Sequence, residues 1–253
     1  MTKIPDQPQE VFVPLTQNYL KVFGSELVSL IVYGSAAAGS YVKGKSDINL
    51  LVVLTPAGIN KLDAAFDTVK YWKKRKVTTP LTMTKAFIET SLDSYPIEFL
   101  NMKNSHVLVY GENVLENLAF QPADLRLQIE REIKGKIILL TQGYLGTEGS
   151  ARQLRQLIRN SFTAFISIFN AMLYLKKEKA PQTRRYTIKE ACNLFSLDPA
   201  VFELCSDIKE GKDNLAGPEI IDTFKKYLHE VEKIGNIVDE LSLIHISEPT
   251  RPY

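Results

Sequence analysis

The sequence has few cysteines and few histidines, and these shortages exclude several classes of protein. Its 253 residues contain two cysteines, Cys192 and Cys205, too few for a disulfide framework and without the spacing of a zinc site. We therefore expect reduced thiols buried in a core, as is usual for a cytoplasmic protein. The three histidines are scattered along the chain and indicate no catalytic triad or metal cluster.

A long apolar run and an excess of one charge are also missing. The most apolar helical run, Ser161 to Leu175, is about 15 residues long, short of the roughly 20 that span a bilayer. We interpret it as a buried helix and expect no membrane segment. The first 13 residues lack the apolar stretch of a secretory signal. Lysine plus arginine number 31 against 29 aspartate plus glutamate, so a long nucleic acid is not an expected partner and any anion site must be local.

The residues that are present are typical of an ordinary globular protein, with 45% hydrophobic and 24% charged side chains. Residues 1–118 alternate β-branched runs with helical periodicity and predict an α/β domain. Residues 119–240 show no strand pattern and predict a bundle of helices. The predicted strands are Leu27–Tyr33, Ile48–Leu54, Pro96–Met102 and His106–Tyr110. The predicted helices are Ala57–Lys74 and, in the second domain, segments near 122–145, 150–178, 187–196, 198–210 and 217–240.

One stretch carries chemistry, the segment between the first two predicted strands. Gly34-Ser35 follows the first strand, where a strand-to-helix turn exposes backbone N–H groups and a hydroxyl that can bind an anion. Asp47 and Asn49 lie two residues apart at the start of the second strand, so both side chains leave one face while Ile48 enters the other. Two oxygen ligands then stand beside an anion cradle.

This segment, from Tyr33 to Leu54, resembles the nucleotidyltransferase superfamily, which includes DNA polymerase beta, poly(A) polymerases and aminoglycoside-adenylating enzymes. The resemblance continues more weakly through Pro96–Lys103 and His106–Glu112, as in bacterial members with a helical C-terminal domain. It implies an α/β (α+β) domain with a mixed sheet followed by an all-α bundle. It also implies transfer of a nucleoside monophosphate from an NTP to the hydroxyl of a small-molecule or protein acceptor, with Mg²⁺ or Mn²⁺.

The same resemblance assigns roles to individual residues. Catalysis falls to Asp47 and Glu98, and the metal to Asp47, Asn49 and Glu98. The nucleotide-binding residues are Gly34, Ser35, Lys45 and Ser46. The sequence departs from the family pattern at Asn49, where the family has a second carboxylate. Because asparagine brings no negative charge to Mg²⁺, a catalytically silent module that binds nucleotide or a partner protein is the alternative. A non-enzymatic helical adaptor is a third hypothesis.

Each of these residues also has a purely structural interpretation. The Gly34-Ser35 pair could be an ordinary turn, Asp47 a cap at the start of a strand, and Glu98 a solvent-facing residue of an edge strand. A run of cations closes the predicted helix Ala57–Lys74. Its structural interpretation is a solvated helix end that complements the helix dipole, and its functional interpretation is a role in guiding triphosphate or nucleic acid. Its members are Lys70, Lys73, Lys74, Arg75 and Lys76.

The last thirteen residues, 241–253, break the pattern that precedes them. Leu241-Ser-Leu-Ile-His-Ile-Ser-Glu-Pro-Thr-Arg-Pro-Tyr253 resembles the translated read-through of a sequencing-library adapter. We therefore expect this tail not to be native and the natural C-terminus to be missing, and His245 is not a candidate ligand.

Overall fold

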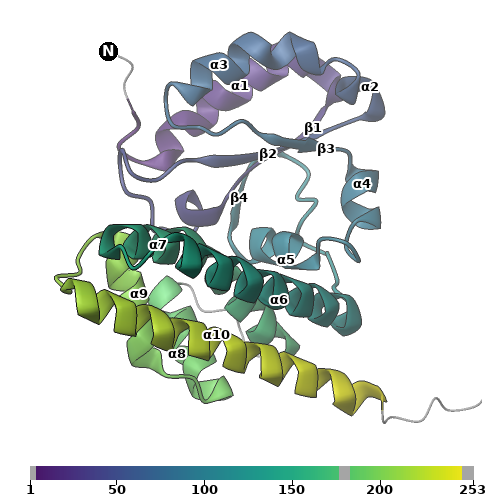
Figure 1. Cartoon of the computed structure of the whole chain (residues 1–253). Helices are drawn as coiled ribbons and strands as arrows, with labels where there is room; N and C mark the ends of the chain where they lie inside the picture. Colours follow the sequence, from purple (N-terminus) through teal and green to yellow (C-terminus); the bar gives the residue numbers. More distant parts are fainter. Residues whose placement is uncertain (1–3, 177–182, 247–253) are drawn as a thin grey trace, which may run out of the picture. The chain divides into compact units, whose positions relative to one another are not determined.

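The computed structural model describes residues 4–176 and 183–246. The chain divides between Phe120 and Gln121 into two compact units, each with its own buried core. The N-terminal unit combines a four-stranded sheet with helices, and the C-terminal unit is helical (Figure 1). The predicted fold class, a mixed-sheet domain followed by a helical region, is confirmed. The last seven residues of the adapter-like tail, 247–253, lie outside the described residues.

The sheet of the N-terminal unit is mixed. Its strands are β1 (Leu27–Tyr33), β2 (Asn49–Leu54), β3 (Leu81–Met83) and β4 (His106–Gly111). They lie in the order β3-β2-β1-β4, with β1 antiparallel to both β2 and β4, and β2 parallel to β3. Three of the predicted strands are thereby confirmed, and Ile48 precedes β2 as an isolated bridge to Val77.

Helices lie on both sides of this sheet. The α-helices of the unit are α1 (Phe12–Phe23), α2 (Pro56–Ile59), α3 (Phe66–Lys73), α4 (Lys85–Thr90) and α5 (Pro96–Asn104). Short 3₁₀ segments are η1 (Pro8–Val11), η2 (Gly24–Glu26), η3 (Gly34–Ala36) and η4 (Leu62–Ala65). Helices α1 and α3 lie on one side of the sheet and α5 on the other (Figure 1). Trp72 joins the two covering helices, because its indole N–H donates to Asn18 Oδ1 at 3.1 Å.

Two predictions for this unit are wrong. The segment Pro96–Met102 is not a strand but the helix α5, because Pro96 occupies the first turn, where its fixed φ favours a helix. Ile97, Phe99 and Leu100 are all buried, which is a helical pattern and not an alternation. The predicted helix over 57–74 is also broken, into α2, η4 and α3.

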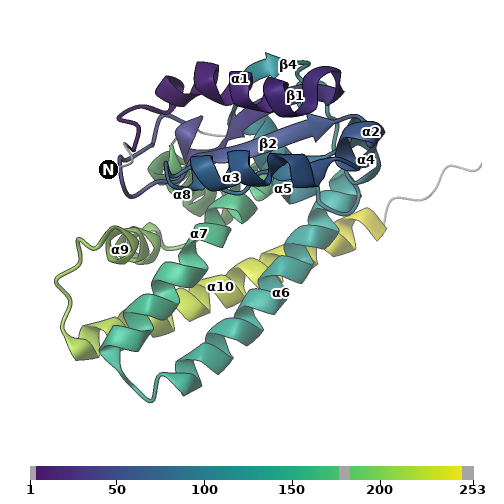
Figure 2. The same cartoon turned by 90° about the horizontal axis from the view of Figure 1, so that it is seen from above.

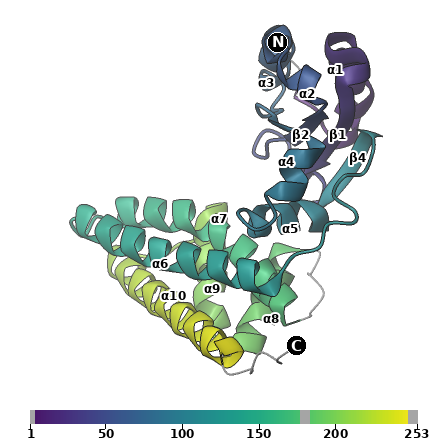
Figure 3. The ribbon, with the colours of Figure 1, turned by 90° about the vertical axis from the view of Figure 1, so that its right-hand side faces the viewer.

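The C-terminal unit consists, in its described part, of helices close to the predicted ranges. These are α6 (Pro122–Gly146), α7 (Ala151–Leu175), α8 (Arg184–Phe195), α9 (Pro199–Glu210) and α10 (Gly217–Ile246). Figure 2 shows α6, α7 and α10 as its three long helices, and Figure 3 shows α8 and α9 beside them. The long helices pack against one another in all three pairs. The unit is therefore a bundle.

The apolar run of α7 is the centre of that bundle, as its sequence predicts. Phe162, Phe165 and Phe169 are fully buried. The ring of Phe165 meets Tyr227 edge-on at 5.6 Å, and that of Phe169 meets Phe202 at 5.2 Å. Among the described residues, no helix combines the length and apolar character that crossing a membrane requires.

The two cysteines are free and buried, as the sequence predicts. Burial raises the pKa of the Cys192 thiol to about 12 and also raises the pKa of Cys205, so both stay protonated at pH 8. Because the thiolate is the reactive form, we expect native protein to react with a disulfide reagent such as DTNB at least about a hundredfold more slowly than urea-unfolded protein. Rapid release of two thionitrobenzoate equivalents from native protein would contradict this.

Candidate functional site

The turn after β1 is fixed by hydrogen bonds on both sides of Gly34. This residue has a φ of 74°, in the left-handed region that glycine tolerates. Its N–H donates to the carbonyl of Ser105 at 3.0 Å, and its own carbonyl accepts the N–H groups of Ala37 and Ala38 at 2.9 Å each. The hydroxyl of Ser105 also donates to that carbonyl, at 3.3 Å. Strand β1 and the C-terminal end of α5 are thus joined at Gly34.

These bonds change the expected anion cradle. The turn continues into η3, which has only three residues, and the Gly34 N–H is already occupied by Ser105. What remains for a ligand is the half-buried Ser35, whose hydroxyl has no hydrogen-bond partner within the described part of the chain. The prediction that Gly34 and Ser35 bind nucleotide therefore depends on the Ser35 hydroxyl more than on a helix N-terminus.

Asn49 stands directly against this turn. It is the first residue of β2, is half-buried, and pairs with Tyr33 across the strands. A Cβ built on Gly34 would lie 3.0 Å from Asn49 Nδ2, so the amide side chain packs over the glycine. The pairing of β1 with β2 therefore brings the two parts of the motif, 15 positions apart in the chain, into contact.

Asp47 is open to solvent and forms an ion pair. Its side chain is 54% exposed, and Oδ1 lies 3.4 Å from Nζ of Lys76. Lys76 is placed there by its backbone, since it has a φ of 65° and its carbonyl accepts the N–H of Ile48 at 2.8 Å. Ile48 between Asp47 and Asn49 is fully buried, which fits the expected alternation of faces.

The other two residues expected to bind nucleotide belong to the turn that leads into Asp47. Ser46 has a structural role, because its hydroxyl accepts the N–H of Val42 at 3.0 Å and closes the turn. Lys45 is exposed and has no carboxylate within 4.0 Å among the described side chains. Lys45 is therefore available to a phosphate, whereas Ser46 is already hydrogen-bonded.

Glu98 lies on a different element from the one expected. It is exposed in the first turn of α5 and not on a strand beside β2. The end of α5 that reaches Gly34 is Ser105, seven residues later, which is about 10 Å along a helix. The strand that does pair with β2 is β3, Leu81–Met83, which contains no acidic residue. The role of Glu98 as third ligand stays a prediction.

Lys76 and Ser105 are the two site residues that the sequence reasoning missed. Lys76 was interpreted as one of a solvated group of cations, and Ser105 has no distinguishing motif. No group of three or more His, Cys, Asp or Glu side chains in the described part of the chain is placed to hold a metal ion. Asp47 therefore does not belong to such a group of three.

Comparison with known proteins supports the fold. No protein-family model and no curated protein matches the sequence. Among solved structures, the chain is similar to the spectinomycin adenyltransferase AAD(9) from Enterococcus faecalis, crystallised with ATP and spectinomycin. The TM-score is 0.52 at 13% sequence identity, over 88% of this chain and 99% of the other. The chain thus shares the fold of a nucleotidyltransferase.

The contact between Gly34 and Asn49 gives a test of the turn. Gly34→Ala is expected to lower the free energy of unfolding by about 1–2 kcal/mol through backbone strain, and further through the clash with Asn49. Gly39→Ala is the matched control, because Gly39 has a φ of 69° with no heavy atom within 4 Å of its Cβ position. Urea unfolding should show the larger loss for Gly34→Ala, and Gly34→Ala/Asn49→Ala should recover the difference. Equal losses at the two glycines would contradict the packing of Asn49.

Proposed function

We propose that this chain is a nucleotidyltransferase that transfers a nucleoside monophosphate from an NTP to an acceptor hydroxyl. In this reaction the acceptor oxygen attacks the α-phosphorus, the bond to the β-phosphate breaks, and pyrophosphate leaves. The observation that carries the proposal is the contact of Asn49, two residues after Asp47, with the Gly34-Ser35 turn. The shared fold with an adenyltransferase supports the same reaction class.

The metal that such a reaction uses is Mg²⁺ or Mn²⁺, which neutralises the charge of the triphosphate when bound. Asp47 and Asn49 are the residues that would hold it, since both offer the oxygen ligands that hard cations prefer. The donor set fits one cation better than two, because Asn49 is uncharged and β3 adds no acid. The role of Glu98, as base or further ligand, is part of the proposal and rests on the resemblance alone.

The ion pair of Asp47 with Lys76 is a weak obstacle to a cation. Both side chains are well exposed, 54% and 41%. Exposed pairs of this kind contribute about 0–1 kcal/mol, so a cation can displace the lysine at little cost. The released ammonium of Lys76, together with that of Lys45, can then neutralise phosphate oxygens.

A small hydroxylated molecule is the acceptor that we favour. The similar adenyltransferase was crystallised with ATP and spectinomycin, which supports ATP as donor and a small molecule as acceptor. The near balance of 31 basic and 29 acidic residues provides no general attraction for a long nucleic acid. A protein side chain is the second acceptor class to test.

The direct experiment measures pyrophosphate release with each of the four NTPs and Mg²⁺ or Mn²⁺, using spectinomycin and other hydroxylated small molecules as acceptors. We expect turnover by the wild type and its loss in Asp47→Ala, since the only carboxylate of the motif is removed. Asn49→Asp is expected to raise turnover by about tenfold or more, because a second carboxylate strengthens the metal site. Glu203→Ala, an exposed carboxylate of α9, is the matched control and should leave turnover unchanged.

The second candidate is a catalytically silent module that binds nucleotide, and Asn49 is the observation that favours it. In that case turnover is absent in the wild type and is gained only in Asn49→Asp, while calorimetry still detects NTP binding. Neither turnover nor NTP binding in any variant would overturn both candidates and leave the adaptor hypothesis.

Lys76 provides a further prediction, for metal binding. Because Lys76 competes with a cation for Asp47, Lys76→Ala is expected to tighten Mn²⁺ binding by up to about fivefold, the equivalent of 1 kcal/mol. Mn²⁺ binding is measured from the free-ion signal in electron paramagnetic resonance. The control is Lys43→Ala, which removes a lysine that pairs with Asp6 in the same unit. Unchanged Mn²⁺ affinity in both Lys76→Ala and Asp47→Ala would show that the cation does not bind at Asp47.

A further inference from the structure

A cavity lies in the N-terminal unit, on the other face of the sheet from Asn49. It has a volume of about 720 Å³, within the range of pockets that hold small ligands. Its walls come from α1, β2, η4 with α3, and the segment 79–82 that leads into β3. Val52 lines it, and strand alternation places Val52 on the opposite face from Asn49. This cavity is therefore separate from the candidate nucleotide site.

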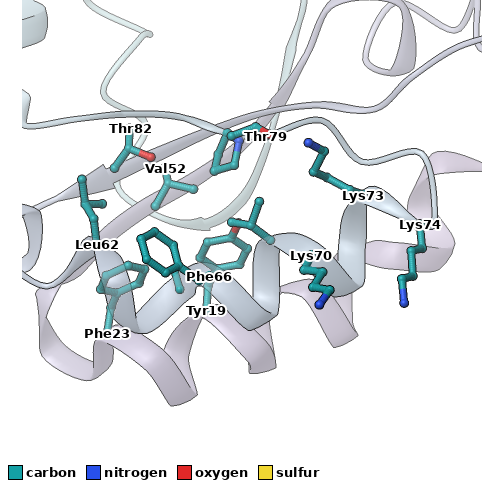
Figure 4. A pocket seen from close by; sticks show the side chains of 13 residues that line it. Tyr19, Phe23, Val52, Leu62, Phe66, Lys70, Lys73, Lys74, Thr79 and Thr82 are labelled. Atoms are coloured by element: carbon teal, nitrogen blue, oxygen red, sulfur yellow. The ribbon is translucent and has the colours of Figure 1, made fainter.

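One end of the cavity is apolar. Its floor is made by Tyr19, Phe23 and Val52, all of which are at least 95% buried. At its edge stand Leu62 and Phe66, and the Phe66 side chain is 70% exposed. Figure 4 shows these side chains gathered together below Thr82. The floor is already buried, so an apolar group placed over this end would remove chiefly the exposed side chains of Leu62 and Phe66 from water.

The other end of the cavity is cationic. Lys70, Lys73 and Lys74 line it from the C-terminal end of α3. Figure 4 shows the side chain of Lys73 reaching toward Thr79 and those of Lys70 and Lys74 extending the other way. None of the residues that line the cavity is acidic. Among the described side chains, no carboxylate lies within 4.0 Å of any of the three ammonium groups.

Arg75 and Lys76, which follow these three lysines in the sequence, have other partners. The guanidinium of Arg75 stacks on the ring of Tyr71 at 3.5 Å and donates to the Tyr71 carbonyl. Lys76 pairs with Asp47. A solvated helix end explains cations in general, but it does not explain why the three without a partner are those on the wall of an apolar cavity.

We propose that this cavity binds a small amphiphilic anion. Its apolar body covers Leu62 and Phe66 over the buried floor, and its carboxylate, sulfonate or phosphate head lies at Lys73, with Lys70 and Lys74 adding positive charge at the same end of α3. Because the cavity is on the other face of the sheet from Asp47 and Asn49, the proposal does not depend on the chain being a nucleotidyltransferase. It makes the N-terminal unit a two-site domain, with an effector or second-substrate site behind the sheet.

The test is a fluorescence titration of the full chain with two probes of matched shape. The first, 8-anilinonaphthalene-1-sulfonate, is an amphiphilic anion, and the second, N-phenyl-1-naphthylamine, has the same aromatic body without the sulfonate. We expect saturable binding of the anion at one site per chain. Lys70→Glu/Lys73→Glu is expected to lower the affinity for the anionic probe at least about tenfold and to change the affinity for the neutral probe less than about twofold.

Three further variants make the result specific to this cavity. Thr82→Phe fills the apolar end and should weaken both probes. Lys189→Glu/Lys225→Glu makes the same charge change on exposed lysines of the C-terminal unit and should weaken neither. Lys70→Gln/Lys73→Gln provides a second way to remove the charges if the glutamate variant does not fold, as judged by circular dichroism.

Four outcomes would overturn the proposal. The first is that the anionic probe shows no saturable binding, and the second is that Lys189→Glu/Lys225→Glu loses as much anion affinity as Lys70→Glu/Lys73→Glu. The third is unchanged anion affinity in Lys70→Gln/Lys73→Gln, and the fourth is unchanged binding of both probes in folded Thr82→Phe. Retention of the neutral probe together with loss of the anion is the result that supports it, because a merely destabilised cavity would lose both.

Discussion

The antiparallel pairing of β1 with both of its neighbours is the constraint on which the rest of the N-terminal unit depends. Tyr33, the last residue of β1, is paired with Asn49 on one side and with His106 on the other. The chain must therefore turn at Gly34 between two strands that are already in register. That turn requires a left-handed φ, and its N–H finds the carbonyl of Ser105 because Ser105 immediately precedes β4. The register of the sheet thus brings the residues of the candidate site together without the help of a ligand.

Strand alternation places the polar motif and the cavity on opposite faces of the same sheet. On β2, Leu50, Val52 and Leu54 belong to the core covered by α1 and α3, where the cavity lined by Val52 opens. Asp47 and Asn49 leave the other face, as Ile48 enters the core between them. Leu50–Leu54 of β2 are all buried, so apolar side chains cover both faces of the strand. The polar motif stays accessible because it stands at the start of the strand, where Asp47 precedes β2 and Asn49 is its first residue.

The parts of this arrangement that could be predicted from sequence are those encoded in a few neighbouring residues. Leu27–Tyr33 is a strand in the structure because its β-branched run ends at a glycine, and α7 is buried along the phenylalanines that repeat at helical spacing. The strand prediction for Pro96–Met102 is wrong because Ile97-Glu98-Phe99 alternates locally as a strand does, while the following Leu100 completes the buried face of a helix. The short edge strand β3 was not predicted, since three residues carry too little pattern to separate them from a loop.

The site residues divide in the same way. Gly34, Ser35, Asp47 and Asn49 could be proposed as site residues because they form one short segment with a recognisable spacing, and their roles stay predictions. Lys76 could not, because it reaches Asp47 only through the pairing of Ile48 with residues 76–78, which no local pattern reveals. Ser105 depends likewise on β4 lying beside β1. Contacts between distant segments are the information that a single sequence lacks, and here they decide what surrounds the motif.

The charge that surrounds the motif bears on the proposed binding of a nucleotide. Lys45 and Lys76 bring two positive charges and Asp47 one negative charge, whereas Asn49 brings none. With aspartate at position 49, the two carboxylates would cancel the two lysines, and the motif would no longer attract a triphosphate through a local excess of positive charge. With asparagine, the exposed lysines leave a local excess of positive charge, so a triphosphate is attracted with one cation or with none. In the proposed site, Asn49 therefore weakens metal binding and the repulsion of a nucleotide together, so the proposal allows nucleotide binding where turnover is slow.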